Sequence, residues 1–225
     1  MSILNSSIFN IAGGLSYHLR AARFRSSLWK NFRDDVGVWL AEWQPQATEL
    51  ILVGPSAGYC TIGPWLERYD RIVAIEPDPL ARVLFKRLLR ARLGAKGPEI
   101  QWIKNPKFQP DLAQHQLSYL ESVLSAHPNA AILFCNFLGQ LHLLETGLPQ
   151  VQLSDFLKGR AWASFHDRVS GEVVPEAHAL PNIFTSRLSN EEVLKKFYRL
   201  RSGELVDHQT DVFFEKCSGR NWRYL

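Results

Sequence analysis

Short apolar segments alternate with longer amphipathic segments from residue 49 onward, and this alternation limits the folds open to the chain. Each apolar segment has five or six residues, the length of a buried strand, and strands separated by helical segments are typical of a parallel sheet. The predicted strands are 49–53, 71–75, 99–103, 130–135 and 160–165. Helices are predicted at 59–69, 80–93, 111–126 and 137–146, and from Ser189 onward.

The spacing of these units predicts a doubly wound α/β fold, in which a mostly parallel sheet is covered by helices on both faces. Two β-like segments within 205–217 bring the expected number of strands to seven and predict a C-terminal antiparallel hairpin. Residues 169–188 are weakly patterned and predict a long loop. Such a loop often serves as a lid or a binding element, the alternative being ordinary flexible surface.

Residues 1–48 precede the first predicted strand and are expected to form a helical extension of an α/β domain that spans residues 49–225. Trp39, Leu40 and Trp43 predict that the last helix of this extension packs on the core. The aromatic and basic segment 17–30 has two interpretations. It covers a substrate site, or it packs on the sheet or on a second copy of the chain.

No stretch of the chain approaches the roughly 18 uncharged apolar residues that span a bilayer. The apolar N-terminal segment has no basic residue before it, unlike a signal peptide. We therefore expect a soluble cytoplasmic protein with no membrane partner.

The 26 basic and 22 acidic residues are unevenly distributed, since eight basic residues and one acidic residue lie between Ala81 and Lys107. The helix predicted at 80–93 is therefore a candidate surface for an acidic partner, or a solvated helix face. Cys60, Cys135 and Cys217 lie far apart and form no CxxC pair. They predict reduced, buried thiols, and neither a disulfide nor a metal site.

Small residues follow the first predicted strand at alternate positions, namely Gly54, Ser56 and Gly58. They let the backbone turn tightly and bring its N–H groups close to a ligand at the start of the next helix. Glu76 comes 18 residues after Gly58, at the end of the second predicted strand. A carboxylate at that position can accept both hydroxyl hydrogen bonds of a ribose.

With these two motifs the sequence resembles the class I S-adenosylmethionine-dependent methyltransferases. The first motif of that family is a GxGxG turn, and an acidic residue ends its second strand. Residues 49–225 would then form a Rossmann-like methyltransferase domain. The resemblance implies that Gly54, Ser56 and Gly58 line the methionine part of the cofactor, that Glu76 binds the ribose, that Asn105 contacts the adenine, and that Asn136 faces both cofactor and substrate.

The chain departs from this pattern at two positions. Leu52 stands where the family usually has an acidic residue, and Ser56 replaces the middle glycine. These departures leave open a non-catalytic binding or scaffold protein with the same fold. A nucleotide-dependent oxidoreductase is a further alternative, but Tyr59 occupies the third glycine position of the dinucleotide fingerprint GxGxxG and argues against it.

His166 and Asp167 follow the fifth predicted strand, at the sheet edge where ligands of open α/β sheets bind. As a pair they are candidates to take a proton from a methyl acceptor, and the alternative is a surface turn. The segment 136–139 lacks the Pro-Pro-aromatic element of enzymes that methylate exocyclic amines of nucleic-acid bases, so that substrate class is not expected. The acceptor stays open among small molecules, RNA and protein.

Overall fold

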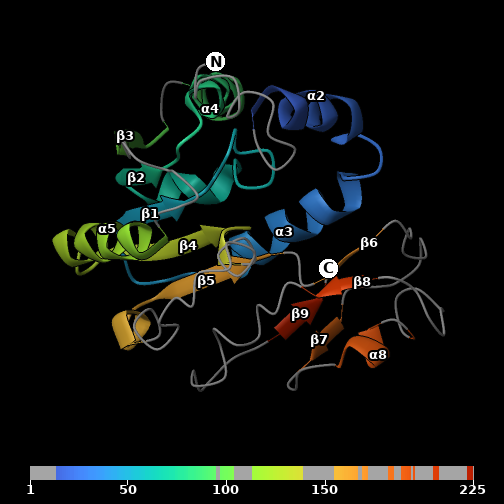
Figure 1. Ribbon diagram of the computed structural model, residues 1–225. Coiled ribbons are helices and arrows are strands. Elements are labelled where there is room, and N and C mark those ends of the chain that lie inside the picture. Colours follow the sequence, from blue (N-terminus) through green and yellow to red (C-terminus); the bar gives the residue numbers. More distant parts are fainter. Residues whose placement is uncertain are drawn as a thin grey trace, which may run out of the picture.

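The computed structural model describes residues 14–94, 97–103, 113–138, 155–166, 169–171, 182–184, 189–193, 195, 205–207 and 222–224. A five-stranded parallel sheet forms its centre, with the strand order β3-β2-β1-β4-β5 (Figure 1). The strands are β1 Glu49–Val53, β2 Arg71–Ile75, β3 Glu99–Ile103, β4 Ala131–Cys135 and β5 Trp162–Phe165. All five lie within the segments that the sequence predicts as strands, which confirms the α/β class and the parallel sheet.

Helices cover both faces of this sheet. They are α2 Gly14–Phe24, α3 Lys30–Glu42, the 3-10 helix η1 Pro64–Arg68, α4 Pro79–Leu93 and α5 Ala113–Ala126, and α8 Asn190–Val193 follows later in the chain. Alternate side chains of β1 enter two different cores. Leu50 and Leu52 pack with α3, η1 and α4, whereas Ile51 and Val53 pack with α5. The sheet is therefore the middle layer of three, as a doubly wound fold requires.

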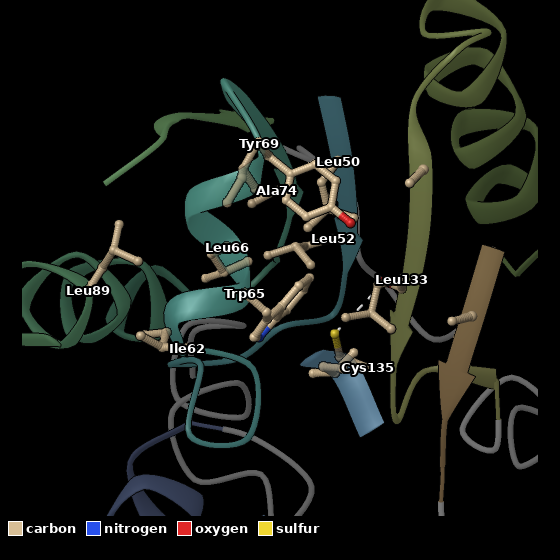
Figure 2. Packing of buried hydrophobic residues seen from close by; sticks show 14 of the residues in the cluster. Leu50, Leu52, Ile62, Trp65, Leu66, Tyr69, Ala74, Leu89, Leu133 and Cys135 are labelled. Carbon is tan, nitrogen blue, oxygen red and sulfur yellow. Dashed lines mark hydrogen bonds between the residues drawn. The ribbon is translucent and has the colours of Figure 1, made fainter. Parts of the chain in front are cut away.

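The core under α3, η1 and α4 is built around Trp65. Figure 2 shows this side chain extending from η1 toward Leu52 of β1 and Leu133 of β4. Leu40 of α3 is fully buried in the same cluster, and Trp39 and Trp43 are half-buried against it. The predicted packing of this helix on the core is thus confirmed.

The ends of α4 follow from its flanking residues. The Asp78 side chain accepts a hydrogen bond of 2.8 Å from the Leu80 N–H, as an N-cap does, and Pro79 takes the first helical position. Gly94 ends the helix with a φ of +66°, a left-handed conformation that glycine adopts without strain. Both ends agree with the helix predicted at 80–93.

Cys60 and Cys135 are free thiols, as the sequence predicts, and Cys217 lies outside the described residues. Cys135 is buried, and its Sγ lies 3.8 Å from the Leu133 carbonyl (Figure 2). Burial raises the pKa of the Cys135 thiol. Cys60 is half-buried rather than buried.

The C-terminal third differs from the prediction. Residues 169–188 were expected as one loop, but they contain β6 Val169–Gly171 and β7 Asn182–Phe184. β6 pairs antiparallel with β8 Leu205–Asp207, and β7 pairs antiparallel with β9 Trp222–Tyr224. The described residues thus show five strands in the main sheet and two separate two-stranded ladders. The predicted hairpin and the two further strands are not shown, since residues 208–217 lie outside the described residues. A strand of three residues is too short to display an alternating pattern, so its sequence resembles a loop.

The first predicted helix is also shorter than expected. The helical pattern begins at residue 59, but η1 begins at Pro64, after Gly63 has taken an extended conformation. Residues 139–150, which include most of the helix predicted at 137–146, lie outside the described residues.

Replacing Tyr69 with phenylalanine is expected to raise the free energy of unfolding by about 1 kcal/mol. Tyr69 is 2% exposed, and its hydroxyl has no hydrogen-bond partner among the described residues. Burial raises the pKa of this hydroxyl to about 12. Urea unfolding measures the effect. Tyr59→Phe is the matched control, because the Tyr59 hydroxyl contacts His18 at 3.0 Å and its loss should lower stability. Equal effects of the two variants on the free energy of unfolding would contradict the absence of a hydrogen-bond partner for the Tyr69 hydroxyl.

Candidate functional site

Four of the predicted site residues lie at one edge of the sheet. Gly54, Glu76, Asn136 and His166 each follow a strand directly, after β1, β2, β4 and β5 respectively. Because the strands are parallel, their carboxyl ends meet at the same edge. The strand order reverses between β1 and β4, and ligands of open α/β sheets bind in the crevice at that point. Asn105 and Asp167 lie outside the described residues.

The glycine turn between β1 and η1 passes close to β4. The Gly54 N–H donates to the Ile75 carbonyl at 2.9 Å, which joins the start of the turn to the end of β2. A Cβ atom at Gly54 would lie 3.4 Å from the Cys135 carbonyl oxygen and 3.6 Å from the Phe137 Cβ. These are ordinary van der Waals distances, so the turn lies against the end of β4, where the strand order reverses, and it is the φ of +67° that favours glycine at position 54.

Ser56 replaces the middle glycine of the motif but keeps the backbone conformation that glycine would favour. Its φ is +49°, in the left-handed region that residues with a Cβ rarely adopt. Its N–H donates to Glu76 Oε2 at 2.7 Å. The turn thus retains the geometry of a glycine-rich turn, with strain stored at Ser56.

Replacing Ser56 with glycine is expected to raise the free energy of unfolding by about 0.5 to 1 kcal/mol. The left-handed conformation costs a residue with a Cβ roughly 1–2 kcal/mol, of which the greater freedom of unfolded glycine cancels a part. Urea unfolding checks this. Ala57→Gly is the control, because the neighbouring Ala57 is fully buried and has no positive φ, so that glycine should destabilise there. A loss of stability in Ser56→Gly would show that the serine side chain contributes more than the backbone strain costs.

Glu76 is a buried carboxylate held by two main-chain groups. It is 5% exposed, its Oε2 accepts the Ser56 N–H, and its Oε1 accepts the Asp78 N–H at 3.0 Å. Burial raises the pKa of Glu76 to about 7, and the two N–H donors counteract part of that rise. An ionised carboxylate offers about four lone-pair sites, and the described residues occupy two of them. Glu76 therefore retains the capacity to accept hydrogen bonds from a ligand.

Arg82 stabilises the corner that carries Glu76. Its Nε donates to the Glu76 carbonyl at 3.0 Å, and its Nη2 donates to the carbonyls of Glu76 and Ile103. Its guanidinium carbon also lies 6.0 Å from the centre of the Trp102 ring. Arg82 thus joins the carboxyl ends of β2 and β3, and this residue of the basic segment 80–93 is structural rather than part of a free partner surface.

Asn136 and His166 lie next to each other because Cys135 of β4 is in register with Phe165 of β5. The Asn136 N–H donates to the Phe165 carbonyl at 2.7 Å, and Asn136 has a left-handed φ of +51°. The His166 ring is half-buried, and its Nδ1 lies 3.0 Å from the Ser164 hydroxyl. A positive φ is tolerated better by asparagine than by most residues, which suits it to the end of β4.

The structure joins His18, Tyr59 and Asp78 to the site through contacts that the sequence does not indicate. His18 of α2 lies with its Nδ1 3.0 Å from the Tyr59 hydroxyl and its Nε2 3.0 Å from Asp78 Oδ2. These contacts connect α2 to the glycine turn and to the corner after Glu76. His18 and Asp78 are 60 positions apart in the sequence, so no local pattern could reveal their contact.

Among the described residues, no group of three or more His, Cys, Asp or Glu side chains is arranged to hold a metal ion. Within the same part of the chain, no helix is long and apolar enough to cross a membrane.

No family model matches the chain, and no curated protein matches it. Among solved structures the chain is similar to SAM-bound CalS10, an amino pentose methyltransferase from Micromonospora echinaspora involved in calicheamicin biosynthesis. The TM-score is 0.32 at 16% sequence identity, with 74% of this chain and 66% of CalS10 covered. The chain thus spans just under two thirds of the length of CalS10. A likeness this distant assigns no activity, so function has to be derived from the site.

Proposed function

We propose that this protein binds S-adenosylmethionine at the carboxyl edge of its sheet and transfers the methyl group to an acceptor. The observation that carries the proposal is the Glu76 carboxylate at the end of β2, fixed by the Ser56 N–H of the glycine turn. Its two remaining acceptor sites match the two hydroxyl groups of a ribose. The proposal includes the seven-stranded class I sheet, of which β1 to β5 form the described part.

Different residues at this edge of the sheet would bind different parts of the cofactor. Glu76 would accept the ribose hydroxyls, and the backbone of the turn from Gly54 to Gly58 would line the methionine part. Asn136 would face both cofactor and acceptor, and Asn105 remains the proposed contact of the adenine. When bound, S-adenosylmethionine supplies a methyl group on a positively charged sulfur.

Direct methyl transfer depends chiefly on how the acceptor is placed. A base is needed when the acceptor has to lose a proton, and His166 with Asp167 remains the proposed source of one. The His166 ring follows β5 beside Asn136, on the same edge as the glycine turn. The acceptor class stays open among small molecules, RNA and protein.

The packing of the glycine turn supports this cofactor over a dinucleotide. A Cβ at Gly58 would come within 2.8 Å of Phe85 in α4, so the turn packs on that helix at Gly58. In the dinucleotide fingerprint the glycine for close helix packing would fall at Tyr59. Tyr59 is instead a buried aromatic residue whose hydroxyl contacts His18.

A binding or scaffold protein without turnover is the second candidate, and Leu52 favours it. Leu52 is fully buried among apolar side chains, where the class I family usually has an acidic residue. Such a protein would have the same fold as the proposed methyltransferase but would not bind the cofactor.

Titration calorimetry of the purified protein with S-adenosylmethionine, S-adenosylhomocysteine and NAD tests the proposal. We expect micromolar binding of the first two ligands and no response to NAD. Binding of NAD alone would overturn the proposal in favour of a nucleotide-dependent oxidoreductase. Binding of none of the three would favour the scaffold.

A further inference from the structure

We infer that His18 is a positioning residue, which orients the Glu76 carboxylate for the ribose by joining α2 to both segments that hold this carboxylate. The inference rests on the proposed function, because it concerns the ribose contact of the same site. It assigns a role in cofactor binding to the segment before β1, which the sequence leaves open between packing and covering a substrate site.

The His18 ring is buried and engaged at both nitrogens. It is 5% exposed, with Nε2 at 3.0 Å from Asp78 Oδ2 and Nδ1 at 3.0 Å from the Tyr59 hydroxyl. Since an ionised carboxylate only accepts hydrogen bonds, the hydrogen on Nε2 forms the hydrogen bond to Asp78. In the neutral ring Nδ1 then accepts from the Tyr59 hydroxyl.

Asp78 collects contacts from both α2 and α4. Its Oδ2 accepts the Gly14 N–H at 3.2 Å as well as the His18 ring, and its Oδ1 accepts the Leu80 N–H at 2.8 Å. The first residue of α2 and a residue one turn further along thus attach to the carboxylate that caps α4. Figure 1 shows α2 beside α4 in agreement with these contacts.

The same two segments hold Glu76. The Asp78 N–H donates to Glu76 Oε1, and the Ser56 N–H donates to Glu76 Oε2. Tyr59 lies three residues after Ser56, at the end of the glycine turn. His18 therefore bridges the donor segment on one side of the carboxylate to the donor segment on the other side.

Packing alone does not account for a histidine at this position. The buried residues of α2 are Gly14, His18 and Ala21, so His18 is the one large side chain that this helix buries. A buried imidazole loses its hydration and is tolerated where hydrogen bonds replace it. Apolar packing would be served as well by leucine, whereas two polar contacts to different segments need a side chain with two separate hydrogen-bonding atoms, which the imidazole supplies.

The test compares S-adenosylhomocysteine with its 2′-deoxy analogue by calorimetry, in the parent protein and in His18→Gln. In the parent, loss of one hydroxyl hydrogen bond to a charged acceptor is expected to weaken binding by roughly 10- to 100-fold. In His18→Gln this discrimination is expected to fall to less than one third of the parent value. Tyr59→Phe removes one of the two contacts and should lower the discrimination less, which keeps the test usable where His18→Gln folds poorly.

A purely structural role predicts a different result. It would weaken both ligands by the same factor and leave the discrimination unchanged, which overturns the inference. Leu19→Ala is the control, because Leu19 lies on the same helix and is 61% exposed, so that its removal should leave the discrimination at the parent value.

A measurement without ligand separates failure of this inference from failure of the proposed function. Amide hydrogen exchange reports directly on the Ser56 and Asp78 N–H groups that hold Glu76. We expect both amides to exchange roughly tenfold faster in His18→Gln than in the parent or in Leu19→Ala. If the parent binds neither ligand, the proposed function fails while the exchange result still decides the role of His18. Unchanged protection of both amides would overturn it.

Discussion

Replacing Glu76 with glutamine is expected to weaken binding of S-adenosylmethionine by about 100-fold. Glutamine has nearly the same shape but no charge, so the proposed ribose hydroxyls lose their charged acceptor. Hydrogen bonds to charged groups contribute roughly 1.5–3 kcal/mol each. Because glutamine keeps one carbonyl oxygen as an acceptor, the expected loss corresponds to about one such bond. Titration calorimetry of parent and variant measures it. Equal affinity of the two proteins would mean that the ribose does not bind at Glu76.

The same substitution is expected to remove the pH dependence that Glu76 gives to the stability of the parent. Burial raises the pKa of Glu76 from 4.5 to about 7, so between these values the folded protein keeps a proton that the unfolded chain releases. The favourable contribution is complete below about pH 4.5 and is lost as the pH rises to about 7. Relative to the parent, Glu76→Gln should therefore be about 2 to 3 kcal/mol more stable at pH 8 than it is at pH 5. A cost that does not depend on pH is added at both values, because the glutamine NH2 faces one of the two N–H donors.

Urea unfolding at pH 5 and pH 8 checks this difference, with the exposed Glu67→Gln as the control that should show no such dependence on pH. Binding should depend on pH with the opposite sign. The ionised carboxylate is the form that accepts hydroxyl groups, so the affinity of the parent should strengthen as the pH rises through about 7. If the difference in stability between variant and parent is the same at pH 5 and at pH 8, the raised pKa of Glu76 is contradicted.

The central sheet could be predicted because its signals are local. In β1, β2 and β4 both alternating sets of side chains are buried or half-buried, apart from the exposed Arg71 at the start of β2. β3 instead alternates, with Glu99 and Gln101 exposed and the apolar residues between and after them half-buried. The end of α4 was equally accessible, since Gly94 stands where a helix C-cap favours glycine. β6, β7 and β9 were missed because each has three residues, and its partner strand lies more than 30 positions away. β8 lies within the predicted β-like segment 205–217, but its pairing with β6 was not anticipated.

The site was predictable to the same extent. Parallel strands end at one edge, so Gly54, Glu76 and Asn136 could be expected near one another from the positions of their strands alone. Ser56 stands where the motif has a glycine, but the shape of the turn is kept, because the serine adopts the left-handed conformation that glycine favours. The contact of His18 with Asp78 could not be anticipated, since it depends on how α2 packs on α4.

Replacing Gly58 with alanine is expected to lower the free energy of unfolding by about 3 kcal/mol. Its φ of +75° costs a residue with a Cβ roughly 1–2 kcal/mol. The new Cβ would also lie 2.5 Å from the Ile62 Cδ1 and 2.8 Å from the Phe85 Cδ2. Ile62 is 4% exposed and Phe85 is fully buried, so neither side chain can move aside freely. Overpacking of this kind costs about 1–3 kcal/mol more.

Gly159→Ala is the matched control, because it separates the backbone cost from the packing cost. Gly159 has a φ of +76°, close to the +75° of Gly58, and a Cβ there would meet no atom within 4 Å. It should therefore lose about 1 kcal/mol, and urea unfolding followed by tryptophan fluorescence should place Gly58→Ala well below it. Equal losses would mean that the glycine turn does not pack on α4 at Gly58. In that case Gly58 would no longer speak against a dinucleotide cofactor, because its close contact with Phe85 of α4 is what disfavours one.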